Sequence, residues 1–74
     1  MTAALVFTIE VDVALARPPR ADATRRVLVA VDPWTSDFAA ANEAALVASQ
    51  MAQSHPGVVM AVGTRQVGEP RLVP

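Results

Sequence analysis

His55 is the chain's one histidine and the side chain best suited to general base catalysis. A serine nucleophile would have to lie beside it. Ser36 is roughly 28 Å away if a helix with a rise of 1.5 Å per residue connects the two residues. Ser54 is adjacent in sequence, but neighbouring side chains on a helix do not face each other. We therefore expect no catalytic residue and no enzyme activity, and we expect His55 to contact the carbonyl groups at a helix end, which favour a cation.

The carboxylates and glycines are not expected to form a catalytic, metal-binding or nucleotide-binding site. Glu10 and Asp12 stand two residues apart, as paired catalytic carboxylates on one strand could, but a domain this thin offers no cleft, so we interpret them as solvated charges. The chain has no cysteine, and its carboxylates lack the spacing of zinc or calcium ligands. Its three glycines lack the spacing of a nucleotide-binding loop. We expect neither a metal nor a cofactor.

Four of the six arginines, which are the only basic residues besides His55, lie close together in sequence: Arg17, Arg20, Arg25 and Arg26. One interpretation is contact with the phosphates of a nucleic acid, and the other is a solvated loop in which Arg26 pairs with Asp12 across two strands. The net charge is -1, and no aromatic residue lies within this segment to stack on bases. Nucleic-acid binding is therefore our alternative hypothesis and not the first.

Apolar periodicity predicts the elements that must position these residues. Strict alternation over residues 4–16 predicts a long strand, and shorter apolar runs predict strands over 26–32 and 58–67. Two prolines place a connection at residues 17–25. A helix is predicted over residues 36–53.

The helix has a start signal, a stop signal and an apolar side. Thr35 or Ser36 can serve as its N-cap, and Pro56 followed by Gly57 ends it. At 100° per residue, one side of the helix is apolar. That side consists of Phe38, Ala40, Ala41, Ala44, Ala45, Val47, Ala48, Met51 and Ala52.

The order of elements predicts a single α+β domain, ββαβ, over residues 1–67, with a flexible tail over 68–74. Its antiparallel three-stranded sheet has the order 2-1-3 and one helix on one face, which is half of a ferredoxin-like arrangement. We expect the helix to cover Phe7, Ile9, Val11, Val27, Val29, Met60 and Val62. The other face would carry Ala4, Val6, Thr8, Glu10, Asp12, Leu28, Ala30, Val59, Ala61 and Gly63.

A domain of 74 residues rarely draws more than ~3–5 kcal/mol from one core. Without disulfides, self-association is the natural supplement, so we predict a homodimer that forms through the uncovered sheet face or a sheet edge. The residues that we expect to contact a partner are Trp34, Leu46, Val6, Leu28 and Val59. Trp34 could be an interface anchor or a staple that closes the start of the helix, and we favour the staple.

The N-terminus lacks the basic segment of a signal peptide, and no apolar run approaches the roughly 18 residues of a membrane span. We therefore expect a cytoplasmic protein that binds other proteins and no membrane.

The segment of residues 42–52, followed by His55-Pro56-Gly57-Val58-Val59-Met60 and then Thr64-Arg65, resembles short proteins of unknown activity encoded by bacteriophages of actinobacteria. Those proteins place an alanine-rich helix before Pro-Gly, a Val/Met strand and a Thr-Arg pair. The likeness extends over residues 4–67 as a pattern and over 42–65 as a motif. It implies a phage accessory protein that acts in the host cytoplasm, and it brings no functional residues with it.

Overall fold

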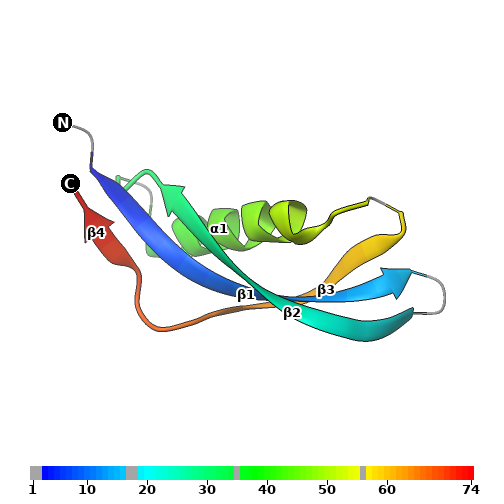
Figure 1. The fold of residues 1–74 in the computed structure, drawn as a ribbon. Coiled ribbons are helices and arrows are strands. Elements are labelled where there is room, and N and C mark those ends of the chain that lie inside the picture. Colours follow the sequence, from blue (N-terminus) through cyan, green and yellow to red (C-terminus); the bar gives the residue numbers. More distant parts are fainter. Residues whose placement is uncertain (1–2, 17–18, 35, 56) are drawn as a thin grey trace.

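The computed structural model describes the chain except for residues 1–2, 17–18, 35 and 56. Its elements in chain order are β1 (Ala4–Ala16), β2 (Pro19–Val31), α1 (Asp37–Ala52), β3 (Val59–Gln66) and β4 (Arg71–Val73). The strands form one antiparallel sheet in the order β2-β1-β3, and α1 covers one face of it (Figure 1). The predicted α+β fold with strand order 2-1-3 is confirmed.

The central strand β1 is paired along both of its sides. β2 runs along one side, whereas β3 pairs with residues 9–15 and β4 pairs with residues 4–6 on the other. A hydrogen bond of 2.9 Å from the Val67 N–H to the Thr8 carbonyl continues the β3 side of the ladder. We expected a tail without regular structure after residue 67. That expectation is wrong for Arg71–Val73, because the unpaired start of β1 offers them a ladder.

β2 begins at Pro19 and not at residue 26. The connection predicted over residues 17–25 is therefore wrong for residues 19–25, and residues 17–18 lie outside the described part of the chain. Proline is tolerated at the first residue of an edge strand, because the outer side of that strand needs no ladder partner. Pairing with the long β1 extends the strand, with a β-bulge where Val13 pairs with Ala23 and Ala14 pairs with Ala21.

The core lies between α1 and the sheet. Alternate residues of β1 meet a row of helix alanines spaced four residues apart, whose small side chains let the helix approach the strands closely. The buried residues of this core are Phe7, Ile9, Val11, Val13, Val29, Val31, Ala40, Ala44, Ala48 and Ala52.

Two large side chains that we placed on the buried side of the helix are exposed. Phe38 is 78% exposed, and Met51 is also exposed. The buried row from Ala40 to Ala52 advances by about 40° around the axis every four residues at ~100° per residue, and so follows the twist of the sheet. The side of α1 that faces the sheet therefore changes from its start to its end. Phe38, two residues before Ala40, lies nearly opposite this row at ~100° per residue, and Met51, one residue before Ala52, lies about a quarter turn from it.

The faces of the first half of β3, residues 59–62, are the reverse of those predicted, whereas Gly63 lies on the open face as predicted. Val59 and Ala61 pack against the core, whereas Met60 and Val62 are exposed. The cause is a bulge at Val62, since Asp12 pairs with Gly63 but Val13 pairs with Ala61. One extra residue moves every following side chain of a strand to the opposite face.

Candidate interaction site on the open sheet face

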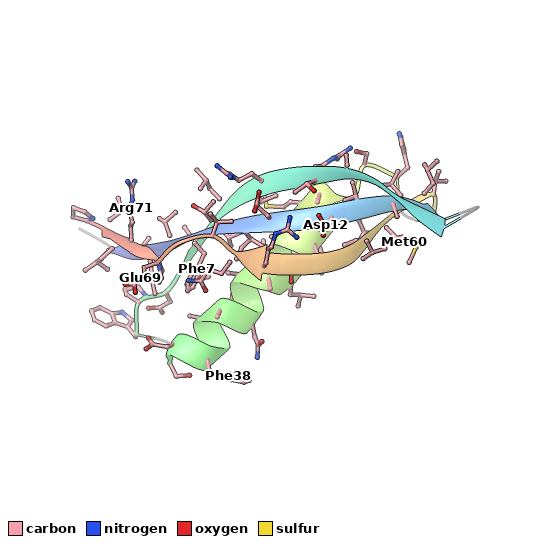
Figure 2. All side chains as sticks on the ribbon, turned by 90° about the horizontal axis from the view of Figure 1, so that it is seen from below. Phe7, Asp12, Phe38, Met60, Glu69 and Arg71 are labelled. Carbon is pink, nitrogen blue, oxygen red and sulfur yellow. The ribbon has the colours of Figure 1, made fainter. Side chains whose placement is uncertain are left out.

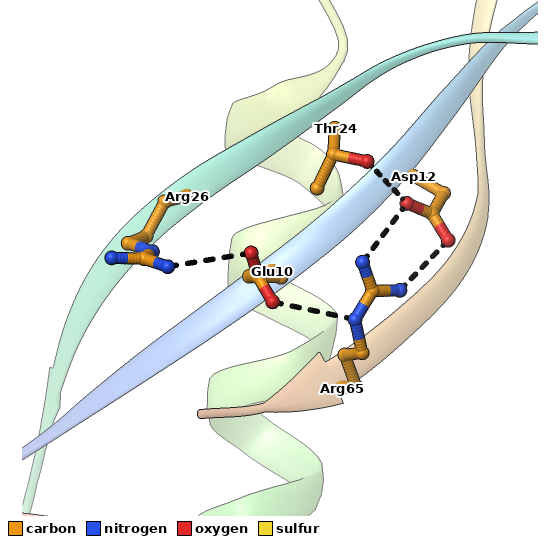
Figure 3. Close-up of polar contacts among 5 residues, drawn as sticks. All are labelled: Glu10, Asp12, Thr24, Arg26 and Arg65. Atoms are coloured by element: carbon orange, nitrogen blue, oxygen red, sulfur yellow. Dashed lines mark hydrogen bonds and ion pairs between the residues drawn. The ribbon is translucent and has the colours of Figure 1, made fainter. Parts of the chain in front are cut away.

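The face of the sheet that α1 leaves uncovered is called the open face below. It carries a central cluster of polar side chains with apolar residues at both ends. β1 contributes Glu10 and Asp12, β2 contributes Thr24 and Arg26, and β3 contributes Arg65 (Figure 3). The strand register explains this assembly, because Glu10 lies opposite Arg26 on one side and opposite Arg65 on the other.

Arg65 joins the two carboxylates of the cluster. Its Nη1 donates to Asp12 Oδ2 at 2.9 Å, and its Nε lies 3.3 Å from Glu10 Oε1. The Thr24 hydroxyl donates to Asp12 Oδ1 at 2.7 Å, and Arg26 Nη2 lies 3.4 Å from Glu10 Oε2. Two carboxylates thus face two guanidinium groups, and the cluster is neutral overall. It cross-links three strands, and its charges are engaged with one another, unlike the free base of a catalytic site.

The hydrogen bond from Arg65 holds the pKa of Asp12 below its ordinary value of 3.8, and the hydrogen bond from Thr24 adds to this effect. The folded chain therefore holds the Asp12 proton less tightly than the unfolded chain does. Asp12 contributes stability above about pH 3.8, and this contribution is lost as the pH falls through the lowered pKa of the folded state.

Replacing Arg65 with Gln is expected to raise the pKa of Asp12, because the strongest donor to the charged carboxylate is lost. NMR titration of the Asp12 carboxyl carbon measures this shift directly. Arg71→Gln is the matched control, since Arg71 lies on β4 and pairs with Val6, outside the cluster. An Asp12 pKa that is the same in Arg65→Gln as in the unmodified chain would show that Arg65 does not bind Asp12 in solution.

The predicted partner contacts fall in different places. Val6 and Leu28 lie on the open face as expected, and Leu28 is 67% exposed. Leu46 is exposed on α1. Val59 is not on the open face, because the bulge in β3 turns it toward the helix. Trp34 is 85% exposed, so the staple interpretation is wrong, since a packed staple would be covered.

The cation at the end of α1 is Arg25 and not His55. Arg25 Nη1 donates to the Ala52 carbonyl at 2.6 Å and to the Ser54 hydroxyl at 2.8 Å. His55 is exposed, and its own carbonyl accepts the Val59 N–H at 2.8 Å. Sequence reasoning missed the role of Arg25 because it placed this residue in a loop. A cation is favoured at this position by the unpaired carbonyls of the last helical turn.

The two arginines of the predicted cluster whose side chains the structure describes, Arg25 and Arg26, do not converge on one site. Arg25 and Arg26 are consecutive residues of β2, so their side chains leave the strand on opposite faces. Arg26 contacts Glu10 and not Asp12, because the register places it opposite Glu10. Arg17 lies outside the described residues, and the side chain of Arg20 is likewise not described. The two arginines with described side chains therefore bind partners within the chain and do not form a shared anion site.

Across the described residues, no three His, Asp or Glu side chains are grouped closely enough to hold a metal ion. No described helix has the length and apolar character that a membrane crossing requires. No protein family model matches the chain, and no curated protein or solved structure is significantly similar to it.

Proposed function

We infer that this chain is a non-enzymatic protein-interaction module that acts as a homodimer. The observation that carries this proposal is the exposure of large apolar side chains on several elements of a small domain. Leu28 is exposed on the open face, Met60 is exposed on β3, and Trp34 and Leu46 are exposed elsewhere. A second protein that covered these side chains would remove their apolar area from water, which is favourable.

The composition of the core supports the same proposal. The helix contributes four alanines to the core, and alanine buries little apolar area. A domain with such a core gains only a few kcal/mol from it, roughly 3–5 kcal/mol. Burial of further apolar surface between two copies would add to this stability, since any partner that binds only the folded state stabilises it.

The resemblance to actinobacterial phage proteins supports a bacterial host cell as the place where this module acts. Under the proposal, the dimer is an accessory protein in the cytoplasm of a bacterial host and binds a host or phage protein. The open face, with its neutral central cluster and apolar ends, then offers a surface for that partner.

The molar mass in solution tests self-association. We expect twice the chain mass of 7.8 kDa at micromolar concentration, with dissociation on dilution. The molecule is elongated, with extents of 45 × 21 × 18 Å, so elution volume alone would overstate its mass. Sedimentation equilibrium or light scattering measures the mass independently of shape. A mass of 7.8 kDa at every concentration up to the millimolar range would refute the homodimer.

A further inference from the structure

The outer edge of β2 carries its protective features on one half only. An exposed strand edge invites pairing with another chain unless charges, prolines or bulges obstruct it. The first half of β2 has Pro19, a bulge opposite Ala14, and the charged Arg25 and Arg26. The second half, Val27-Leu28-Val29-Ala30-Val31, has no charged residue, proline or glycine, and its register with β1 is regular.

The opposite edge of the sheet is better protected. β3 is interrupted by the bulge at Val62 and carries Arg65, whereas β4 has only three residues. Figure 2, which looks at the sheet from the side opposite to α1, shows β2 along one border of the sheet, and in the strand order no described strand pairs with its outer side. Residues 27–31 are thus the longest unprotected edge segment in the described part of the sheet.

In residues 27–31 of β2, the N–H and carbonyl groups of every second residue point away from the sheet. The Thr8 carbonyl accepts the Val67 N–H at 2.9 Å, so the polar groups of Thr8 point toward the β3 side. Thr8 and its partner Leu28 therefore do not exchange hydrogen bonds with each other. It follows that the N–H and carbonyl of Leu28 point away from the sheet, as do those of Arg26 and Ala30, since the direction alternates along a strand.

The segment is complementary to a second copy of itself. In an antiparallel pair centred on Val29, each Leu28 lies opposite Ala30 of the other copy, so that a large side chain adjoins a small one. The outward backbone groups of these two residues then bond to each other. Arg26 of one copy lies opposite Asp32 of the other, which places unlike charges directly across the two strands.

The side chains at the two ends of this pairing are available for it. Asp32 is exposed, and its Oδ1 accepts the Trp34 N–H at 2.9 Å, which holds the carboxylate at the end of β2. Arg26 contacts Glu10, but 63% of its side chain remains exposed. On the helix side, Val27 is half-buried and would be covered by Val31 of the other copy.

We propose that two copies of this chain join through the β2 edge, with residues 26–32 of each in antiparallel register about Val29. The proposal rests on the proposed homodimer and names its interface. It joins the two sheets into one continuous sheet with both helices on the same face. The open face remains uncovered, and its area becomes about twice as large and available to a further protein.

Disulfide trapping tests the register, because the chain has no cysteine of its own. Leu28→Cys and Ala30→Cys are prepared separately and mixed under mild oxidation. Opposite residues of a hydrogen-bonded pair have Cα atoms about 5.5 Å apart, which suits a disulfide. In a dimer of Leu28→Cys alone, or of Ala30→Cys alone, the two introduced cysteines would be about 8–9 Å apart, which is too far. The mixture is expected to give about tenfold more cross-linked dimer than either variant alone.

Two further variants distinguish the β2 edge from the open face. Ala30→Pro removes an outward N–H that the monomer does not use, and is expected to raise the dimer Kd by at least about tenfold. Thr8→Lys places a charge at the centre of the open face on β1, and is expected to change the Kd by less than about twofold. Circular dichroism of each variant below the dimer Kd verifies its fold.

The outcomes separate this proposal from the broader one. Abundant cross-linking in the mixture, together with a weakened Ala30→Pro dimer, supports the β2 interface. Equal cross-linking of the single variants, or a dimer that only Thr8→Lys dissociates, would place the interface on the open face and overturn this inference while the homodimer stands. A monomer of 7.8 kDa at all concentrations would refute the homodimer itself.

Discussion

Replacing Phe7 with Ala is expected to lower the free energy of unfolding by about 3–5 kcal/mol. Phe7 is 2% exposed and is the one aromatic side chain in the core formed by β1, β2 and α1. The variant would leave a cavity among valines and alanines, which are too short to fill it. Because a core of this size supplies only roughly 3–5 kcal/mol in total, we expect the variant to be largely unfolded. Urea and thermal unfolding followed by circular dichroism measure the loss.

Phe38→Ala is the matched control, since it deletes the same atoms from an exposed position. Phe38 is 78% exposed at the start of α1 (Figure 2). Its replacement is expected to change the free energy of unfolding by no more than about 0.5 kcal/mol, and alanine is the better helix former. Both variants must be measured at one protein concentration, because the proposed dimerisation would make stability concentration-dependent. Equal losses at Phe7 and Phe38 would contradict the inclined packing of the helix on the sheet.

Replacing Ala44 with Glu is expected to abolish folding. Ala44 is fully buried in the row of alanines that contacts the sheet. A carboxylate at that position would lose its hydration without gaining a partner, at a cost of several kcal/mol on the order of the whole stability. Loss of the helical signal and of the unfolding transition at 25 °C would be the observed result.

The same substitution at Ala39 is expected to act in the opposite direction. Ala39 is exposed, and its N–H donates to the side chain of the N-cap Ser36 at 3.3 Å. Glutamate three residues after a serine N-cap completes a capping box and places a negative charge near the positive end of the helix. We expect an increase in stability of about 0.5–1 kcal/mol. A loss of stability in Ala39→Glu, or a folded Ala44→Glu, would contradict the orientation of α1.

Local patterns predicted several elements correctly for reasons that the structure makes plain. The alternation over residues 4–16 predicted both ends of β1 and the four β1 side chains of the core, Phe7, Ile9, Val11 and Val13, because successive side chains of a strand point to opposite faces of the sheet. Ser36 is the N-cap, and α1 ends at Ala52, within one residue of the predicted end. Capping and proline effects operate within a few residues, so a sequence displays them directly.

Other features depended on partners distant in sequence. The neighbouring β1 residues Asp12 and Val13 pair with Gly63 and Ala61, which leaves Val62 between them as a bulge. This bulge reversed the predicted faces of residues 59–62. Arg25 reaches the end of α1 only because β2 extends back to Pro19. Neither residue carries a local signal for its role.

From the sequence alone came the types and approximate limits of β1, α1 and β3 and the order of the three long strands, because these follow from periodicity, capping and chain connectivity. Tertiary structure alone decided which side chains meet on the open face and which strand edge is unprotected. Both depend on strand register, and one inserted residue in a ladder changes the partner and the face of every residue beyond it.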